Sequence, residues 1–68
     1  MKRVTGREMC RALEKAGWKQ VRVRSSHFIY DREGALRPIP VPVHGNKLLR
    51  TGTQRSIMRQ AGLTDADL

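Results

Sequence analysis

The sequence has a single cysteine, Cys10, and only two histidines, which lie far apart along the chain. One cysteine cannot form an intramolecular disulfide, and it cannot complete a zinc site with two distant histidines. No apolar run long enough for a signal peptide or a membrane span follows the basic N-terminus. We therefore expect a cytoplasmic protein that uses no metal or other cofactor and does not enter a membrane.

Acidic residues are also scarce, since six Asp and Glu stand against fourteen Lys and Arg and leave a net charge of +8. Two-metal nuclease chemistry needs several converging carboxylates, whereas those before residue 64 are scattered: Glu8, Glu14, Asp31 and Glu33. A chain this basic is expected to bind a polyanion. Nucleic acid is favoured over an anionic membrane surface, which would call for a basic helix with a wide apolar face.

Aromatic residues are few, with one Trp, one Phe and one Tyr in 68 residues. A chain of this length forms one domain, residues 1–68, with room for one small hydrophobic core. Such a core leaves the folded state only marginally stable, which favours a binding partner that adds stability.

Helix signals lie near both ends of the chain. Thr5 and Glu8 have the spacing of a capping box, and Gly17 is typical of a left-handed helix end. A second helix is expected to start with capping chemistry in residues 51–53 and to end at Gly62.

Three strand-like segments separate the helices. In residues 19–24, Val21 and Val23 alternate with polar side chains, which predicts a half-buried strand with one apolar and one basic face. Residues 27–30 continue with β-forming side chains. In residues 37–43 every second position is proline, so all the prolines face one side, and we predict an edge strand protected against further pairing.

The element order predicts an α+β domain with α-β-β-β-α topology, in which both helices pack on one face of a three-stranded antiparallel sheet. This is the layout of the double-stranded-RNA-binding-domain-like (dsRBD-like) fold. A DNA-binding regulator would need a helix-turn-helix pair, and the three intervening strands argue against one.

Histidine is the residue type that most readily exchanges a proton near neutral pH. His27 follows Arg22 and Arg24, so it lies among cationic groups that could hold a phosphate. In metal-independent RNA cleavage a base draws the proton from the ribose 2′-hydroxyl, whose oxygen then attacks the adjacent phosphorus. From local context alone, a surface or structural role for His27 remains the alternative. For His44, at a turn after the proline-bearing segment, we expect a structural hydrogen-bonding role.

Several motifs occur in a fixed order along the chain: Ala16-Gly17-Trp18, Arg22, Ser26-His27, Val41-Pro42-Val43-His44-Gly45, Gly52-Thr53 to Ile57, and Gln60-Ala61-Gly62-Leu63. On these motifs residues 8–63 resemble the HicA toxin family. The resemblance implies the toxin of a type II toxin–antitoxin system, acting as an mRNA interferase through the histidine of a Gly-Ser-His element. By resemblance, His27 takes the catalytic role, and a HicB-type antitoxin is expected to mask it.

The chain departs from the family pattern at one position, because Ser25 stands where the family has glycine before Ser-His. If that glycine supplies a positive backbone angle or lets RNA approach closely, serine would weaken the site.

Candidate RNA-binding residues flank His27 or follow the third strand: Lys19, Arg22, Arg24, Ser25, Ser26 and Lys47. Arg22 and Arg24 alternate on the polar face that leads to His27, which favours phosphate contact. Ser26 could orient the phosphate or the imidazole, or simply cap the strand. For Lys19 and Lys47, a role as solvated surface is an equal alternative.

The main alternative function is a non-catalytic RNA-binding module of the same fold, which would read the shape of an RNA helix through phosphates and 2′-hydroxyls. Only the nuclease would generate new RNA ends in the presence of EDTA.

Overall fold

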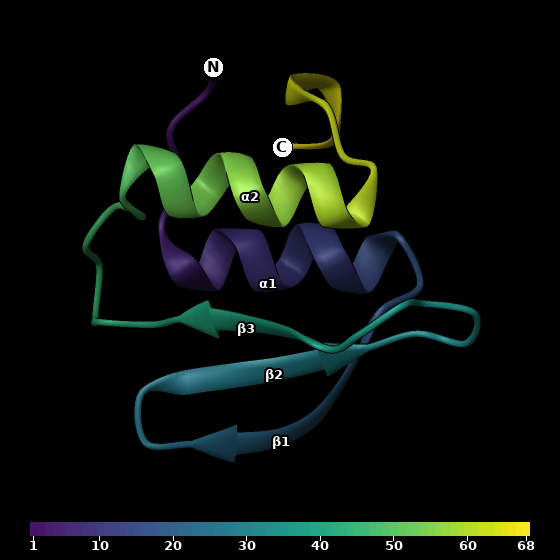
Figure 1. The fold of residues 1–68 in the computed structure, drawn as a ribbon. Helices are drawn as coiled ribbons and strands as arrows, with labels where there is room; N and C mark the ends of the chain where they lie inside the picture. The colour runs from purple at the N-terminus through teal and green to yellow at the C-terminus, as the bar shows by residue number, and fades with distance from the viewer.

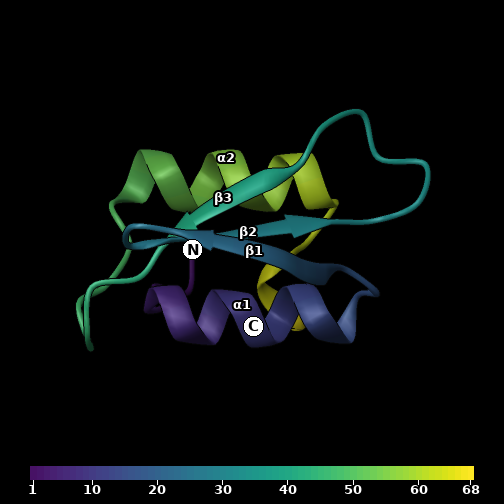
Figure 2. The ribbon, with the colours of Figure 1, turned by 90° about the horizontal axis from the view of Figure 1, so that it is seen from below.

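The computed structural model describes residues 1–68 as α1 (Gly6–Lys15), β1 (Lys19–Arg24), β2 (His27–Asp31), β3 (Ile39–Pro42), α2 (Thr51–Ala61) and a short 3-10 turn, η1 (Asp65–Asp67). The strands form one antiparallel sheet in the order β1-β2-β3. Figures 1 and 2 show α1 and α2 side by side on the same face of this sheet. The predicted α+β, dsRBD-like α-β-β-β-α fold is confirmed. No helix has the length and apolar character needed to cross a membrane.

The ends of α1 follow the predicted signals. The Thr5 hydroxyl accepts a hydrogen bond from the Glu8 N–H at 3.2 Å, and the Glu8 carboxylate accepts one from the Thr5 N–H at 2.8 Å. That backbone hydrogen bond lowers the pKa of Glu8. At the other end Gly17 has φ of +93°, and the Trp18 N–H donates to the Leu13 carbonyl at 2.9 Å.

Helix α2 ends as predicted but starts without a side-chain cap. Gly62 is left-handed, with φ of +70°, and terminates the helix. At the start the N-cap residue is Arg50, whose side chain makes no capping hydrogen bond, while Thr51 and Thr53 already lie inside the helix. The expected capping chemistry in residues 51–53 is therefore wrong. The first N–H groups of α2 are left free to bind another acceptor.

The prediction of an apolar buried face on β1 is also wrong. Every residue of β1 is exposed, including Val21 at 55% and Val23 at 50%. A β-bulge displaces Val21, because Gln20 pairs with Tyr30 and Arg22 with Ile29, which leaves Val21 without a partner. Val23 pairs with Phe28, but β1 is an edge strand and Val23 stays half exposed. One extra residue shifts the alternation of side chains, so Val21 and Val23 do not share a face.

Strand β3 is an edge strand, as the prolines predict. It pairs only with β2, with Ile39 opposite Tyr30 and Val41 opposite Phe28. Ile39 and Val41 are fully buried against the helices, so the alternate residues of β3 lie on the open face of the sheet.

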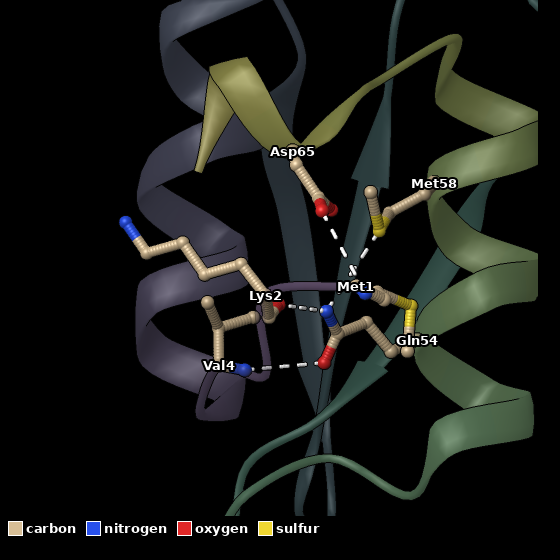
Figure 3. Close-up of polar contacts among 6 residues, drawn as sticks. All are labelled: Met1, Lys2, Val4, Gln54, Met58 and Asp65. Atoms are coloured by element: carbon tan, nitrogen blue, oxygen red, sulfur yellow. Dashed lines mark hydrogen bonds and ion pairs between the residues drawn. The ribbon is translucent and has the colours of Figure 1, made fainter.

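The N-terminal segment is held to α2 by Gln54, a fully buried polar residue. Figure 3 shows its side-chain amide between the helix and this segment. Its Oε1 accepts from the Val4 N–H at 3.1 Å, and its Nε2 donates to the Lys2 carbonyl at 2.6 Å. The Leu49 N–H donates to the Val4 carbonyl at 2.9 Å. The N-terminal segment is therefore bound both to α2, through Gln54, and to Leu49, which lies just before α2.

Replacing Gln54 with Met would leave the buried Val4 N–H and the partly buried Lys2 carbonyl without partners. We expect Gln54→Met to destabilise the chain by about 2 kcal/mol, which lowers the midpoint of thermal unfolding by roughly 10 °C. Circular dichroism on heating measures the change. The control is Gln60→Met, because Gln60 is exposed and bonds only to Ser56 within α2. Equal midpoints for the two variants would contradict this role of Gln54.

Candidate functional site

His27 begins β2, and its side chain lies on the opposite side of the strand from that of the buried Tyr30. Arg24 pairs with it from β1, and Pro42 pairs with it from β3. Side chains of paired residues in antiparallel strands share a face. The imidazole is exposed, so it is accessible to a large substrate.

A pocket of about 470 Å³ opens beside His27, which we call the histidine pocket. Its lining comes from β2, from the end of β3, and from the connection into α2: His27, Pro42, His44, Lys47, Leu48, Leu49, Arg50 and Thr53. Its charged groups are cationic, since it contains Lys47 and Arg50 and no acidic side chain. The pocket therefore favours an anion.

The structure brings His44 to His27 through strand pairing. Pro42 is the β3 partner of His27, and the chain stays paired beyond β3 because the Val43 N–H donates to the Ser26 carbonyl at 2.8 Å. His44 lies two residues beyond Pro42, just after the end of β3, and lines the same pocket as His27. Both imidazoles line the pocket.

Neither imidazole makes a hydrogen bond within the protein. The structural hydrogen-bonding role expected for His44 is therefore not observed. Both rings have their nitrogens available to a ligand.

The start of α2 adds backbone donors to the same pocket. Arg50 and Thr53 line the pocket and belong to the first turn of α2. No hydrogen bond of the protein uses the N–H groups of residues 51–53. A helix N-terminus with free N–H groups attracts phosphate, because its donors and its dipole both favour negative charge.

Among the residues predicted to bind RNA, Lys47 lines the histidine pocket. Arg24 pairs with His27, and Arg22 pairs with Ile29, two residues after His27 on β2. Ser26 is half-buried in the turn before His27. These residues can serve one ligand together with His27.

Lys19 lies elsewhere. It pairs with Asp31 at the far end of β2 and lines another pocket, together with Arg32 and Glu33. The structure does not bring Lys19 together with His27.

Ser25 occupies the left-handed region of backbone conformation, with φ of +57°, and is the only residue other than glycine with a positive φ. It is the first of the two turn residues between Arg24 and His27. Hairpin turns with a positive φ at the first central position favour glycine there. The glycine expected by family resemblance would thus fit this backbone without strain.

We expect Ser25→Gly to stabilise the chain by about 1 kcal/mol, because glycine adopts this φ without the steric cost that serine carries. The midpoint of thermal unfolding should rise by roughly 5 °C. Ser26→Gly is the matched control, since Ser26 does not have a positive φ and glycine there only adds freedom to the unfolded chain. A midpoint that rises with Ser26→Gly and not with Ser25→Gly would refute this explanation.

Two other titratable groups are buried in the core. The Tyr30 hydroxyl donates to the Glu14 carboxylate at 2.7 Å, and burial with this hydrogen bond raises the pKa of Tyr30. Burial also raises the pKa of the Cys10 thiol. Both side chains therefore remain protonated at neutral pH and serve packing. No group of three or more His, Cys, Asp or Glu side chains is arranged to hold a metal ion.

Comparison with known proteins gives one family. The model of the HicA toxin of bacterial toxin–antitoxin systems matches residues 6–63. No curated protein matches the chain. The match extends over both helices, the whole sheet and every residue of the histidine pocket.

Proposed function

Because the chain belongs to the HicA toxin family, and so is the toxin of a toxin–antitoxin system, we propose that it is a metal-independent endoribonuclease that cuts mRNA in the cytoplasm through His27. The observation that supports this function is the histidine pocket, where two free imidazoles meet Lys47 and Arg50. RNA carries its own nucleophile in the 2′-hydroxyl group. Cleavage then requires only transfer of protons and stabilisation of the charge that develops on the phosphate.

His27 is the base of the proposed reaction. An imidazole nitrogen takes the proton of the 2′-hydroxyl, and the oxygen forms a bond to the adjacent phosphorus. Arg24, which pairs with His27 across the strands, can bind a non-bridging phosphate oxygen next to it.

His44 is the acid. As the bond between phosphorus and the 5′ oxygen breaks, the protonated ring of His44 gives its proton to that oxygen. The products are a 2′,3′-cyclic phosphate and a 5′-hydroxyl end, and the two histidines have exchanged protonation states. Two histidines that line one pocket fit these two roles, because the phosphorus lies between the attacking 2′ oxygen and the leaving 5′ oxygen.

Lys47, Arg50 and the free N–H groups of α2 hold the phosphate between the two rings. Charge grows on the non-bridging oxygens during attack, and donors fixed in place before the reaction stabilise it most. Thr53, on the same turn of α2, adds a hydroxyl donor to the pocket.

The antitoxin, proposed to be of the HicB type, masks His27. Because the toxin has a net charge of +8, an acidic partner surface is electrostatically favourable over this face. Binding of such a partner also stabilises the folded state of a small domain.

We expect His27→Ala to slow cleavage of single-stranded mRNA by at least about a hundredfold, which is the usual contribution of a general base. The rate of appearance of new RNA ends is measured with the purified protein in excess EDTA. Arg55→Ala is the control, because Arg55 is exposed on α2 and lies outside the histidine pocket. Persistent cleavage by folded His27→Ala would place the active group elsewhere. Binding without any cleavage by the unchanged protein would identify a non-catalytic RNA-binding module.

The role of His44 is tested with RNA in which sulfur replaces the bridging 5′ oxygen at one linkage. A thiolate leaves without protonation, so we expect His44→Ala to cut this substrate almost as fast as the unchanged protein does, although it cuts ordinary RNA at least about a hundredfold more slowly. His27→Ala should remain slow on both substrates, since the 2′-hydroxyl still needs a base. Rescue of His27→Ala instead of His44→Ala would show that the two roles are reversed, and full activity of His44→Ala on ordinary RNA would exclude the acid role.

A further inference from the structure

A second pocket, of about 550 Å³, lies at the other end of the molecule. It is lined by the residue just before β1, by the β2–β3 loop and by the last turns of α2: Trp18, Arg32, Gly34, Ala35, Leu36, Arg37, Ser56, Arg59 and Gln60. We call it the arginine pocket. The histidine pocket is built on the first residues of β2 and α2, and Figure 1 shows the β2–β3 loop at the opposite end of the sheet from the β1–β2 turn. The two pockets share no residue.

The arginine pocket is cationic and partly apolar. Its charged residues are Arg32, Arg37 and Arg59, with no acidic side chain among those that line it. Asp31 and Glu33, which flank Arg32 in the sequence, line the neighbouring pocket that contains Lys19 and shares Arg32. At the rim Leu36 is 98% exposed, the most exposed large apolar side chain of the protein. A ligand that fits this surface combines negative charge with an aliphatic group.

Trp18 forms the wall of the arginine pocket and contains an unused donor. The residue is only 3% exposed, and its Nε1–H has no hydrogen-bond partner. That nitrogen is itself buried, so this donor is not open to a ligand. Arg32 lies over the indole ring at 4.7 Å from its centroid, and its Nη1 donates to the Ala16 carbonyl at 3.1 Å.

These features favour a polypeptide over RNA. Single-stranded nucleic acid is usually held by exposed aromatic rings on which bases stack. Here the only aromatic ring is buried and one of its faces is covered by Arg32, whereas the exposed group is the aliphatic side chain of Leu36. Carboxylates pair with guanidinium groups in a planar, two-pronged geometry, which suits a site with several arginines.

We infer that the arginine pocket is a second docking site for the antitoxin and takes an acidic segment of that partner with an aliphatic residue against Leu36. Its carboxylates bind Arg37 and Arg59. Because this site lies away from His27, it holds the antitoxin without taking part in RNA cleavage.

The test uses the toxin–antitoxin complex purified after co-expression. Arg37→Glu and Arg59→Glu should each raise the dissociation constant by roughly tenfold, as expected for loss of a charge-assisted hydrogen bond, while the free variants cleave RNA at the unchanged rate. The matched control is Arg55→Glu, which reverses an exposed charge of α2 outside this pocket. Thermal unfolding verifies that each variant is folded, and Arg37→Gln and Arg59→Gln replace any that is not. Equal dissociation constants for all variants would overturn the proposal.

Trp18 is the only tryptophan, so its fluorescence reports directly on this pocket. Titration with a short amidated peptide of glutamate and leucine should change the emission in a saturable way, and Arg59→Glu should weaken this response. A peptide with glutamine in place of glutamate should have no effect. The competing ligand is a 2′-O-methyl RNA, which the toxin cannot cleave. A saturable response to this RNA that Arg59→Glu abolishes, without a response to the acidic peptide, would make the pocket an RNA site and refute the docking proposal.

Discussion

The pairing of β2 with β3 is the constraint on which the candidate site depends. It sets Pro42 opposite His27, and the hydrogen bond from the Val43 N–H to the Ser26 carbonyl extends the pairing by one step. A slip by one residue would send one histidine to the opposite face of the sheet from the other. The buried side chains of Ile39 and Val41 resist such a slip, because it would expose them to water. Packing of Ile39 and Val41 on one face of β3 thus fixes the strand register on which the place of the two histidines depends.

Further contacts hold the two segments that flank this strand pair, namely the turn before β2 and the connection from β3 to α2. On one side, the Ser25-Ser26 turn delivers His27 to the start of β2 at the cost of a positive φ in Ser25. On the other, Gln54 and the bridge between Thr5 and Leu48 fix the chain that leads from β3 into α2. The pocket is therefore held by hydrogen bonds to two segments that are distant in sequence. The start of α2 has no side-chain cap. This costs the helix some stability but leaves its first N–H groups free to bind a phosphate.

Local chemistry made several elements predictable from the sequence. The Thr5 and Glu8 capping box, the left-handed glycines and the alternating prolines each act over a few residues, and each was found where the sequence places it. His27 could be proposed as a candidate site residue because Arg22 and Arg24 lie shortly before it in the sequence. The position of Ser25 was also informative, since the left-handed backbone there explains why glycine suits this turn.

Other features depend on tertiary structure and could not be predicted from the sequence. Val21 and Val23 have the spacing of a buried face, but a bulge between Gln20 and Arg22 separates them. His44 has no local signal, because only the register of β2 and β3 brings it to His27. The capping prediction for residues 51–53 failed because the chain enters α2 with Arg50 as the N-cap. Each case was decided by contacts between segments, which propensity and periodicity do not contain.

In the proposed reaction the ribose 2′-hydroxyl is the nucleophile, His27 takes its proton, and His44 gives a different proton to the leaving 5′ oxygen. The most direct measurement is the chemical nature of the ends left on RNA cut by the purified toxin in excess EDTA, by mass spectrometry or phosphorus NMR. We expect a 2′,3′-cyclic phosphate on one fragment and a 5′-hydroxyl on the other. A 3′-hydroxyl facing a 5′-phosphate would contradict it, because water would then have been the nucleophile.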